Sequence, residues 1–344
     1  MAGACGPGEK VPGSGVLVPC RRVVRSAIVT TEVVSRSEGT SVEPGIVVGV
    51  DPDGAGTSAL RWAVREACAR DAPLTAVRAW MPTAIGAYGP AGALLPNGDG
   101  PEAESMAAEQ LKLALEQVAG SDSLISRSQA VLGAPAQVLL DVGAGSGLIV
   151  VGTRGAGALS RMVLGSVSSA VLHHARTVVA VVPEQPAQVA PPERVLVGFD
   201  HSPAAVAALR VAADLARRHG AVLVPVFVRE QLWVEGQGGT HDDRVEAREL
   251  VEQAAVRGAL EAAGIDSHDV HPQVVPGQVA GRLTAMVTPR DVLVLGSRGR
   301  GGFAGLLLGS TSTQCAQHAV CPVVVVRADS GHEREVGAPI PREP

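Results

Sequence analysis

The chain has 344 residues, of which 46% are hydrophobic and 18% charged, enough for two domains that each bury a core. Aromatic residues make up only 2% and the net charge is −5, so neither base-stacking rings nor a basic surface for nucleic acid is indicated. The five cysteines are scattered and no apolar stretch is long enough to span a membrane, so we expect a soluble, cytoplasmic protein without disulfides or a zinc site.

Two halves with the same order of elements are predicted along the chain. Residues 1–44 show no periodic pattern, and we expect them to form a disordered N-terminal extension. The first half, residues 45–184, alternates short β-branched runs with helical patterns. A connector with three prolines, residues 185–193, leads into the second half, residues 194–328. The tail, residues 329–344, is expected to be disordered as well.

Each half is predicted to contain five strands and four helices. In the first half the predicted strands are 46–51, 73–80, 124–132, 148–152 and 178–183, and the helices are 57–70, 102–119, 134–144 and 166–175. In the second half the strands are 194–199, 221–228, 269–275, 291–296 and 322–327, and the helices are 203–218, 242–263, 277–288 and 310–318. Alternation of strands and helices is typical of parallel sheets, so the predicted fold class is α/β. The valine-rich run 323–326 is expected to be buried on both faces.

Short motifs recur at matching places in the two halves. The run IVVGVD at 46–51 returns as VLVGFD at 195–200, and VVGTRG at 150–155 returns as VLGSRG at 294–299. The second motif opens, in both halves, the spacing G-x2-G-x9-G-S. Such glycines let a ligand approach the backbone, and Gly-Ser at a helix start offers N–H groups and the positive end of the helix dipole. The pattern predicts a phosphate site at the carboxyl end of each sheet.

The spacing G-x2-G-x9-G-[S/T], together with an Asp that closes the first strand, resembles the ATP-binding type of universal stress protein. The resemblance covers both halves and omits the two ends of the chain. It implies two tandem Rossmann-like domains of the adenine-nucleotide alpha-hydrolase-like kind, each a five-stranded parallel sheet of order 3-2-1-4-5 with helices on both faces. It also implies that each half binds ATP, with Mg²⁺ as an accompanying ion, and that the protein is a nucleotide-dependent sensor or regulator in a stress response.

The resemblance further implies where the nucleotide lies. Adenine would lie near the Asp and the end of the second strand, and the phosphates at the glycine loop and the Gly-Ser helix start. Carried over by position, the implied binding residues of the first half are Asp51, Ala79, Gly152, Gly155, Gly165, Ser166 and Val167. Those of the second half are Asp200, Val228, Gly296, Gly299, Gly309, Ser310 and Thr311. The two halves would form an internal pseudo-dimer, and a homodimer and an unidentified protein partner are further expectations.

Two positions depart from the pattern of the family. The acidic residue that opens the fourth strand is present as Asp291 in the second half but is Gly147 in the first. The Ser that follows the first Asp is Ser202 in the second half and Asp53 in the first. Because Asp53 adds a negative charge beside the expected phosphate, we expect the second half to bind nucleotide at least as well as the first.

Three alternatives for the function remain open on the sequence. One is an enzyme that hydrolyses ATP slowly, since bound water and Mg²⁺ could act without a dedicated base. Another is a scaffold with empty pockets. The third is a methyltransferase that uses S-adenosylmethionine, because residues 141–147 spell D-x-G-x-G-x-G. That run is expected to lead from a helix into a strand, the reverse of the order that such a methyltransferase needs.

Several residues also have a structural interpretation. Asp51 and Asp200 could cap the following helix, and Ser166 and Ser310 are expected to be the N-caps of their helices. Trp62 is expected to pack in the core rather than to stack on a base. No catalytic residue and no metal ligand are identified from the sequence.

Overall fold

The computed structural model of the chain describes residues 44–51, 57–81, 101–119, 125–153, 164–184, 190–229, 241–265, 270–300 and 308–328. Residues 1–43 of the segment 1–44 that was expected to be disordered, the tail 329–344 and most of the connector 185–193 lie outside these ranges. Within them, every predicted strand and helix is present, with its bounds shifted by a few residues at most. None of the helices described is both long enough and apolar enough to cross a lipid bilayer.

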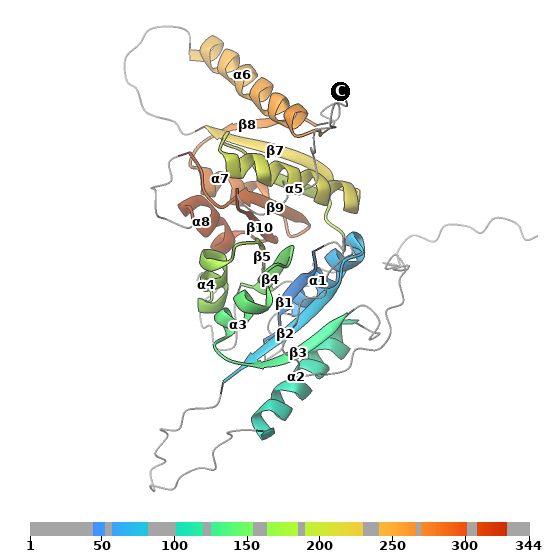
Figure 1. Cartoon of the computed structure of the whole chain (residues 1–344). Helices are drawn as coiled ribbons and strands as arrows, with labels where there is room; N and C mark the ends of the chain where they lie inside the picture. The colour runs from blue at the N-terminus through green and yellow to red at the C-terminus, as the bar shows by residue number, and fades with distance from the viewer. Residues whose placement is uncertain are drawn as a thin grey trace, which may run out of the picture.

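The two halves contain the same succession of elements and lie one above the other in Figure 1. The first half contains β1 (Ile46–Gly49), α1 (Thr57–Arg70), β2 (Leu74–Trp80), α2 (Pro101–Ala119), β3 (Arg127–Leu132), α3 (Pro135–Val142), β4 (Leu148–Gly152), α4 (Ser166–His174) and β5 (Val178–Val182). The second half contains β6 (Arg194–Gly198), α5 (Pro203–His219), β7 (Val222–Arg229), α6 (His241–Ala262), β8 (Gln273–Pro276), α7 (Val279–Met286), β9 (Asp291–Gly296), α8 (Ser310–His318) and β10 (Val323–Val326).

The strands of the described residues form one continuous sheet. Its order is β3-β2-β1-β4-β5-β10-β9-β6-β7-β8, so each half has the order 3-2-1-4-5 counted along its own chain. Neighbouring strands within a half are parallel. The halves meet where β5 and β10 pair antiparallel, with Val181 opposite Val323. The predicted α/β fold class, with its largely parallel sheet, is thereby confirmed.

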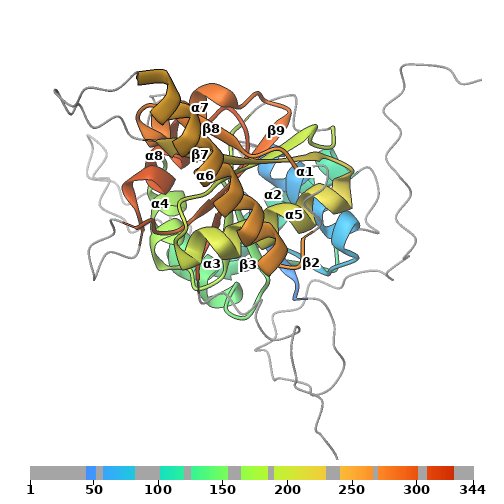
Figure 2. The ribbon, with the colours of Figure 1, turned by 90° about the horizontal axis from the view of Figure 1, so that it is seen from above.

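The strands at this junction are buried on both faces. Along β5, Val178, Ala180 and Val182 belong to one apolar cluster, and Val179 and Val181 belong to another. The first cluster takes its helical residues from α1, α2, α5 and α6, and the second from α3, α4, α7 and α8, so helices cover both faces of the sheet (Figure 1 and Figure 2). The four valines of β10 alternate between the clusters in the same way, as expected.

Helix α5 shows how the local sequence sets the bounds of an element. Its N-cap is Ser202, whose side chain accepts a hydrogen bond from the backbone N–H of Ala205 (3.1 Å). Pro203 follows at a position where no N–H is needed. Gly220 ends the helix in the left-handed conformation (φ 64°), and its N–H bonds to Ala216 O. The apolar residues in between recur at helical spacing and enter the first cluster.

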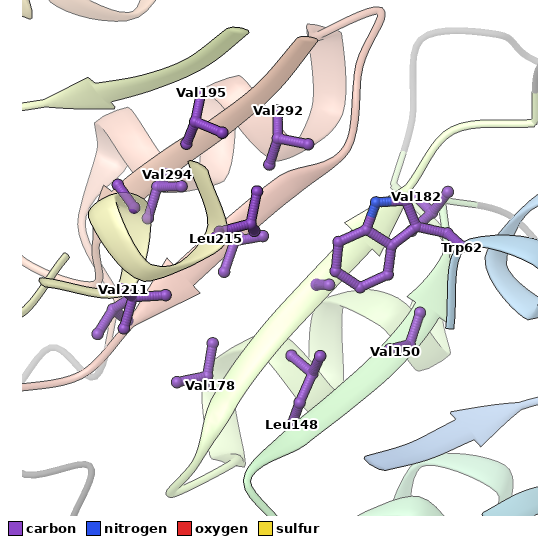
Figure 3. Packing of buried hydrophobic residues seen from close by; sticks show 14 of the residues in the cluster. Trp62, Leu148, Val150, Val178, Val182, Val195, Val211, Leu215, Val292 and Val294 are labelled. Atoms are coloured by element: carbon purple, nitrogen blue, oxygen red, sulfur yellow. The ribbon is translucent and has the colours of Figure 1, made fainter. Parts of the chain in front are cut away.

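Trp62 fills the core close to the junction of the two halves. It lies on α1, is fully buried, and packs in the same cluster as Val150 of β4 and Val182 of β5 (Figure 3). Leu215 of α5, from the second half, belongs to this cluster as well. The indole N–H of Trp62 has no acceptor among the described residues, so the ring is held by apolar contacts. The expectation that Trp62 is a packing residue is confirmed.

A buried polar contact joins the halves beside this core. Glu66 on α1 accepts a hydrogen bond from Nε2 of His219 at the end of α5 (2.5 Å), and the two side chains are 1% and 5% exposed. The other carboxylate oxygen accepts from Arg70 Nε (3.3 Å). Burial acts to raise the pKa of Glu66, but the hydrogen bond from His219 and the charges of Arg70 and Arg65 outweigh it and hold the pKa below its usual value. The junction therefore contains a buried, charged carboxylate.

Candidate functional site

Asp200 follows β6 and joins the end of that strand to the glycine loop after β9. Its Oδ1 accepts a hydrogen bond from Ser202 N and its Oδ2 from Arg300 N, both at 3.0 Å. Ser202 also donates from Oγ to Arg298 O (3.2 Å). The cap of α5 is Ser202, so the interpretation of Asp200 as the cap of that helix is wrong. A carboxylate has about four acceptor positions, so both oxygens of Asp200 retain capacity for a further donor such as a hydroxyl.

The first two glycines of the loop allow close contacts between parts of the protein. A Cβ on Gly299 would lie 2.5 Å from Asp200 Oδ2. A Cβ on Gly296 would lie 2.8 Å from the backbone carbonyl carbon of Ala204. At Gly296 the backbone of α5 therefore leaves no room for a side chain, and at Gly299 a side chain would displace the Asp200 carboxylate.

The third glycine of the motif begins α8. Gly309 is the N-cap, in an extended conformation (φ −82°, ψ 156°), and its N–H bonds to Ser297 O (2.7 Å). Ser310 is the first helical residue, and it is exposed. The expectation that Ser310 caps this helix is therefore wrong, because the cap must be extended and the chain is already helical at the serine.

The N–H groups at the start of α8 are suited to an anion. A helix leaves its first N–H groups without an acceptor of its own, and Gly309 has no side chain to supply one. In the described part of the chain, nothing accepts from the backbone N–H of Ser310 or of Thr311. The first turn contains no acidic residue. These N–H groups and the positive end of the helix dipole together favour a phosphate.

The first half repeats this arrangement at α4. Gly165 is the N-cap (φ −60°, ψ 154°), and its N–H bonds to Thr153 O (2.8 Å). Ser166 is again the first helical residue and not the cap, for the same reason as in α8, and the first turn again lacks acidic residues. Asp51, shortly after the end of β1, is half-buried. Gly155 lies outside the described residues.

The remaining predicted residues lie around the same two ends of the sheet. Ala79 near the end of β2 and Val228 near the end of β7 are half-buried and pack against the second apolar cluster. Val167 in the first turn of α4 packs on that cluster too, and Thr311 is its counterpart on α8. Apart from Gly155, the structure thus gathers the predicted residues of each half at the carboxyl ends of its strands.

Two buried serines that are not among the predicted residues complete these helix starts. Ser168 Oγ donates to the carbonyl of Gly152, the last residue of β4 (2.5 Å). Ser312 Oγ lies at hydrogen-bond distance from Ser297 O (3.3 Å) and Gly309 O (3.0 Å). Each serine ties the first turn of its helix to the end of the preceding strand. The repeated pattern G-S-x-S at the start of both helices is the signal that could have identified them.

The glycine run 141–147 lies at the opposite end of the sheet. Asp141 belongs to the last turn of α3, and the glycines lead from that helix into β4. Gly147 N bonds to Gly45 O, just before β1 (2.9 Å). A methyltransferase loop of this pattern leads from a strand into a helix, so the run has the wrong order and the wrong place for that function.

The departure from the family pattern at Gly147 and Asp291 is explained at this same end. Asp291 lies opposite Arg194, which donates from Nε and Nη2 to its two carboxylate oxygens (3.0 and 2.7 Å). In the first half the matching positions are Gly45 and Gly147, and a Cβ on Gly147 would lie 2.9 Å from Pro44 O. The second half therefore has the ion pair Arg194–Asp291 where the first half has Gly45 and Gly147 in close contact. Both arrangements lie at the end of the sheet opposite to the starts of α4 and α8.

The fold and the paired helix starts define a tandem doubly wound α/β protein. Residues 45–183 and 192–327 each match the family model described as the Universal stress protein family. The chain belongs to this family.

Relatives of similar length support the assignment. A universal stress protein of Mycolicibacterium smegmatis is 34% identical over 296 residues, which cover 84% of this chain and 98% of that protein. Universal stress protein Rv2005c of Mycobacterium tuberculosis is 31% identical over 296 residues, covering 82% of this chain and 97% of that protein. A crystal structure of a universal stress protein from Archaeoglobus fulgidus has the same fold, with a TM-score of 0.56 and 20% identity over 83% of this chain and 97% of that one.

Proposed function

We propose that each half of the chain binds ATP or a closely related adenine nucleotide, and that the protein acts as a nucleotide-dependent regulator of a stress response. The observation that carries the proposal is the duplicated helix start. In both halves a glycine N-cap, an exposed serine and a buried serine two residues further on follow the fourth strand. Free N–H groups at such a helix start bind the phosphates of nucleotides in many proteins.

Gly309 is the glycine of the second-half motif whose surroundings point to a ligand. At Gly296 an added Cβ would meet backbone atoms of Ala204 within 3.0 Å, and at Gly299 it would meet the Asp200 carboxylate, so contacts within the protein already favour glycine at both positions. At Gly309 the nearest atom, Ser297 O, would be 3.3 Å away, and the backbone conformation suits any residue. A side chain would fit there with a small adjustment, but it would stand beside the N–H groups of α8. Close approach of a phosphate gives a reason for the glycine that packing does not.

The other end of the nucleotide would lie toward Asp200 in the second half and Asp51 in the first. Asp200 is held by two backbone N–H groups, so its carboxylate is fixed in place to accept from a ribose hydroxyl or from the amino group of adenine. Val228 and Ala79 offer small apolar surface for the flat base at the end of the neighbouring strand. A ligand that spans Asp200 and α8 would hold these two elements together, and this is how occupancy would change the surface offered to a partner.

Replacing both exposed serines with aspartate tests the proposal. A carboxylate at the first helical position favours the helix dipole by about 0.3–1 kcal/mol, so Ser166→Asp/Ser310→Asp should melt at or above the temperature of the unchanged chain. The same charge repels phosphate by about 1–4 kcal/mol at 4 Å, so the Kd for ATP should rise about fivefold or more. Calorimetric titration with ATP and thermal melting measure the two effects.

Asparagine is the matched control, because Ser166→Asn/Ser310→Asn has a similar shape and adds no charge. It should bind ATP more tightly than the aspartate variant. Each single aspartate variant should raise the Kd for ATP at one of the two sites only, which assigns the two sites. Native mass measurement of the purified chain adds the identity and number of bound nucleotides. ATP binding that is unchanged in the double aspartate variant would contradict the proposal.

A further inference from the structure

Arg327, the residue after β10, reaches from the second half to a helix of the first. Its Nη2 donates to Leu172 O (3.2 Å) and to His173 O (2.7 Å). Both carbonyls belong to the last turn of α4, where the helix itself supplies no further N–H donors. The contact follows from the antiparallel junction, because the end of β10 lies beside the start of β5, where α4 has just ended.

The backbone of the second-half site leads directly to this arginine. Ser297, the first residue after β9, donates from its N–H to Val326 O (2.7 Å), one residue before Arg327. Ser297 O in turn accepts from Gly309 N at the start of α8 (2.7 Å). Arg327 is therefore separated by two backbone hydrogen bonds from the helix start proposed to bind phosphate in the second half.

The far end of α4 is the helix start proposed to bind phosphate in the first half. The helix has nine residues, so Arg327 acts about 14 Å from Ser166. A guanidinium on the last carbonyls neutralises the negative end of the helix dipole and so stabilises the last turn of α4. It also fixes the axial position of the helix, and hence the position of its first N–H groups.

The second half has no equivalent contact in the described part of the chain. The residue of the first half that matches Arg327 is Pro183, which has no donor. The carbonyls of α8 that match those of Leu172 and His173 belong to Ala316 and Gln317, and no described side chain donates to them. Among the described residues, a side chain of the second half therefore supports a helix of the first half, without a counterpart in the reverse direction.

We propose that Arg327 is a positioning residue, supplied by the second half, for the nucleotide site of the first half, and that it couples the two sites. The inference rests on the proposed function. Nucleotide bound at the start of α8 would hold Gly309 and Ser297 in place and would thereby strengthen the support of α4 by Arg327. Binding at the first site would strengthen binding at the second to the same extent, because linkage is reciprocal.

Single-site backgrounds give the direct test. In Ser310→Asp the first half should be the tighter of the two ATP sites, and adding Arg327→Met should raise the Kd of that half by about three- to tenfold. In Ser166→Asp the second half should be the tighter site, and Arg327→Met should leave the Kd of that half within about twofold. Arg327→Lys, which keeps the charge, should recover part of the loss. Arg217→Met is the control for removal of one positive charge, since that side chain is 74% exposed and pairs with Asp214 on its own helix.

Hydrogen exchange of the nucleotide-free chain supplies a second readout. Arg327→Met should speed exchange at the end of α4, including the Ala175 N–H that bonds to Val171 O, and should leave the matching Ala319 N–H of α8 unchanged. If Arg327→Met does not fold, Arg327→Gln takes its place.

Three results would overturn the inference. If Arg327→Met raises the Kd for ATP equally at both sites, the change destabilises the chain in general. If Arg327→Met leaves the Kd of the first site as it was, the contact has no effect on binding. In either case the unchanged chain still binds two nucleotides, so the proposed function stands. An unchanged chain that binds no nucleotide at either site would remove the proposed function and this inference with it.

Discussion

Replacing Arg194 with methionine should lower the free energy of unfolding by about 3–5 kcal/mol at neutral pH. The reason is the partner that the change leaves behind. The Asp291 side chain is 0% exposed, and its oxygens also accept from the N–H and the hydroxyl of Thr288 (2.6 and 2.9 Å). Without the guanidinium, a buried carboxylate keeps its charge or must take up a proton, and both outcomes destabilise the fold.

The pH dependence of this loss has a defined sign. Burial acts to raise the pKa of Asp291, but the hydrogen bonds and charge of Arg194 and the bonds from Thr288 hold the pKa below its usual value. The contribution of the ion pair to the free energy of unfolding is therefore fully present above the pKa of aspartate in the unfolded chain. It is lost as the pH falls through the lower pKa of Asp291 in the folded chain. The gap in stability between Arg194→Met and the unchanged chain should be widest at neutral pH and should narrow in acid.

Asp291→Asn completes a double-mutant cycle. It leaves Arg194, whose side chain is 37% exposed and can be hydrated, so it should cost only about 1–3 kcal/mol. The double variant should be about as stable as Asp291→Asn alone, since the arginine has lost its charged partner. Urea unfolding followed by circular dichroism measures all three. Additive losses from the two single changes would contradict the assignment of this pair.

Trp62→Ala should lower the free energy of unfolding by about 3–5 kcal/mol, because it opens a cavity in the core that the two halves share. The ring is fully buried and lies over β4 and β5, next to the junction. Trp62→Phe should cost much less, since it keeps an aromatic ring and removes an N–H that has no acceptor among the described residues. Urea unfolding followed by circular dichroism again gives the comparison.

Trp80 is the matched control for this change. It stands at the end of β2, is only half-buried, and its indole N–H also has no acceptor in the described residues. Trp80→Ala should therefore destabilise the chain less than Trp62→Ala does. Equal losses from the two alanine variants would show that the junction core does not depend on Trp62.

The elements could be predicted from local sequence because local interactions set their bounds. Ser202, Pro203 and Gly220 mark the ends of α5, and runs such as β10 are apolar on both faces because both are covered. The antiparallel pairing of Val181 with Val323 could not be predicted in this way. Two valine-rich edges carry no signal that selects a partner, and only the packed halves decide which edges meet.

The location of the candidate site follows from the repeated spacing, but the role of each residue does not. The same motif contains Gly296 and Gly299, where contacts within the protein favour glycine, and Gly309, where a side chain would fit with a small adjustment. Spacing cannot separate these cases, because the difference depends on neighbours distant in sequence. The prediction that Ser166 and Ser310 are N-caps was wrong for a related reason. Gly165 and Gly309 adopt the extended conformation of the cap, and each serine is the first residue of its helix.

The pairing of β5 with β10 has a consequence for synthesis on the ribosome. β5 is complete when half of the chain has been made, whereas its partner is the last strand of the sheet. Until β10 emerges, Val178–Val182 is an unpaired edge of five apolar residues, the kind of strand that recruits other chains. We therefore expect the nascent first half to be more prone to aggregate than the complete chain, and rapid translation of the second half should shorten the time for which that edge is unpaired.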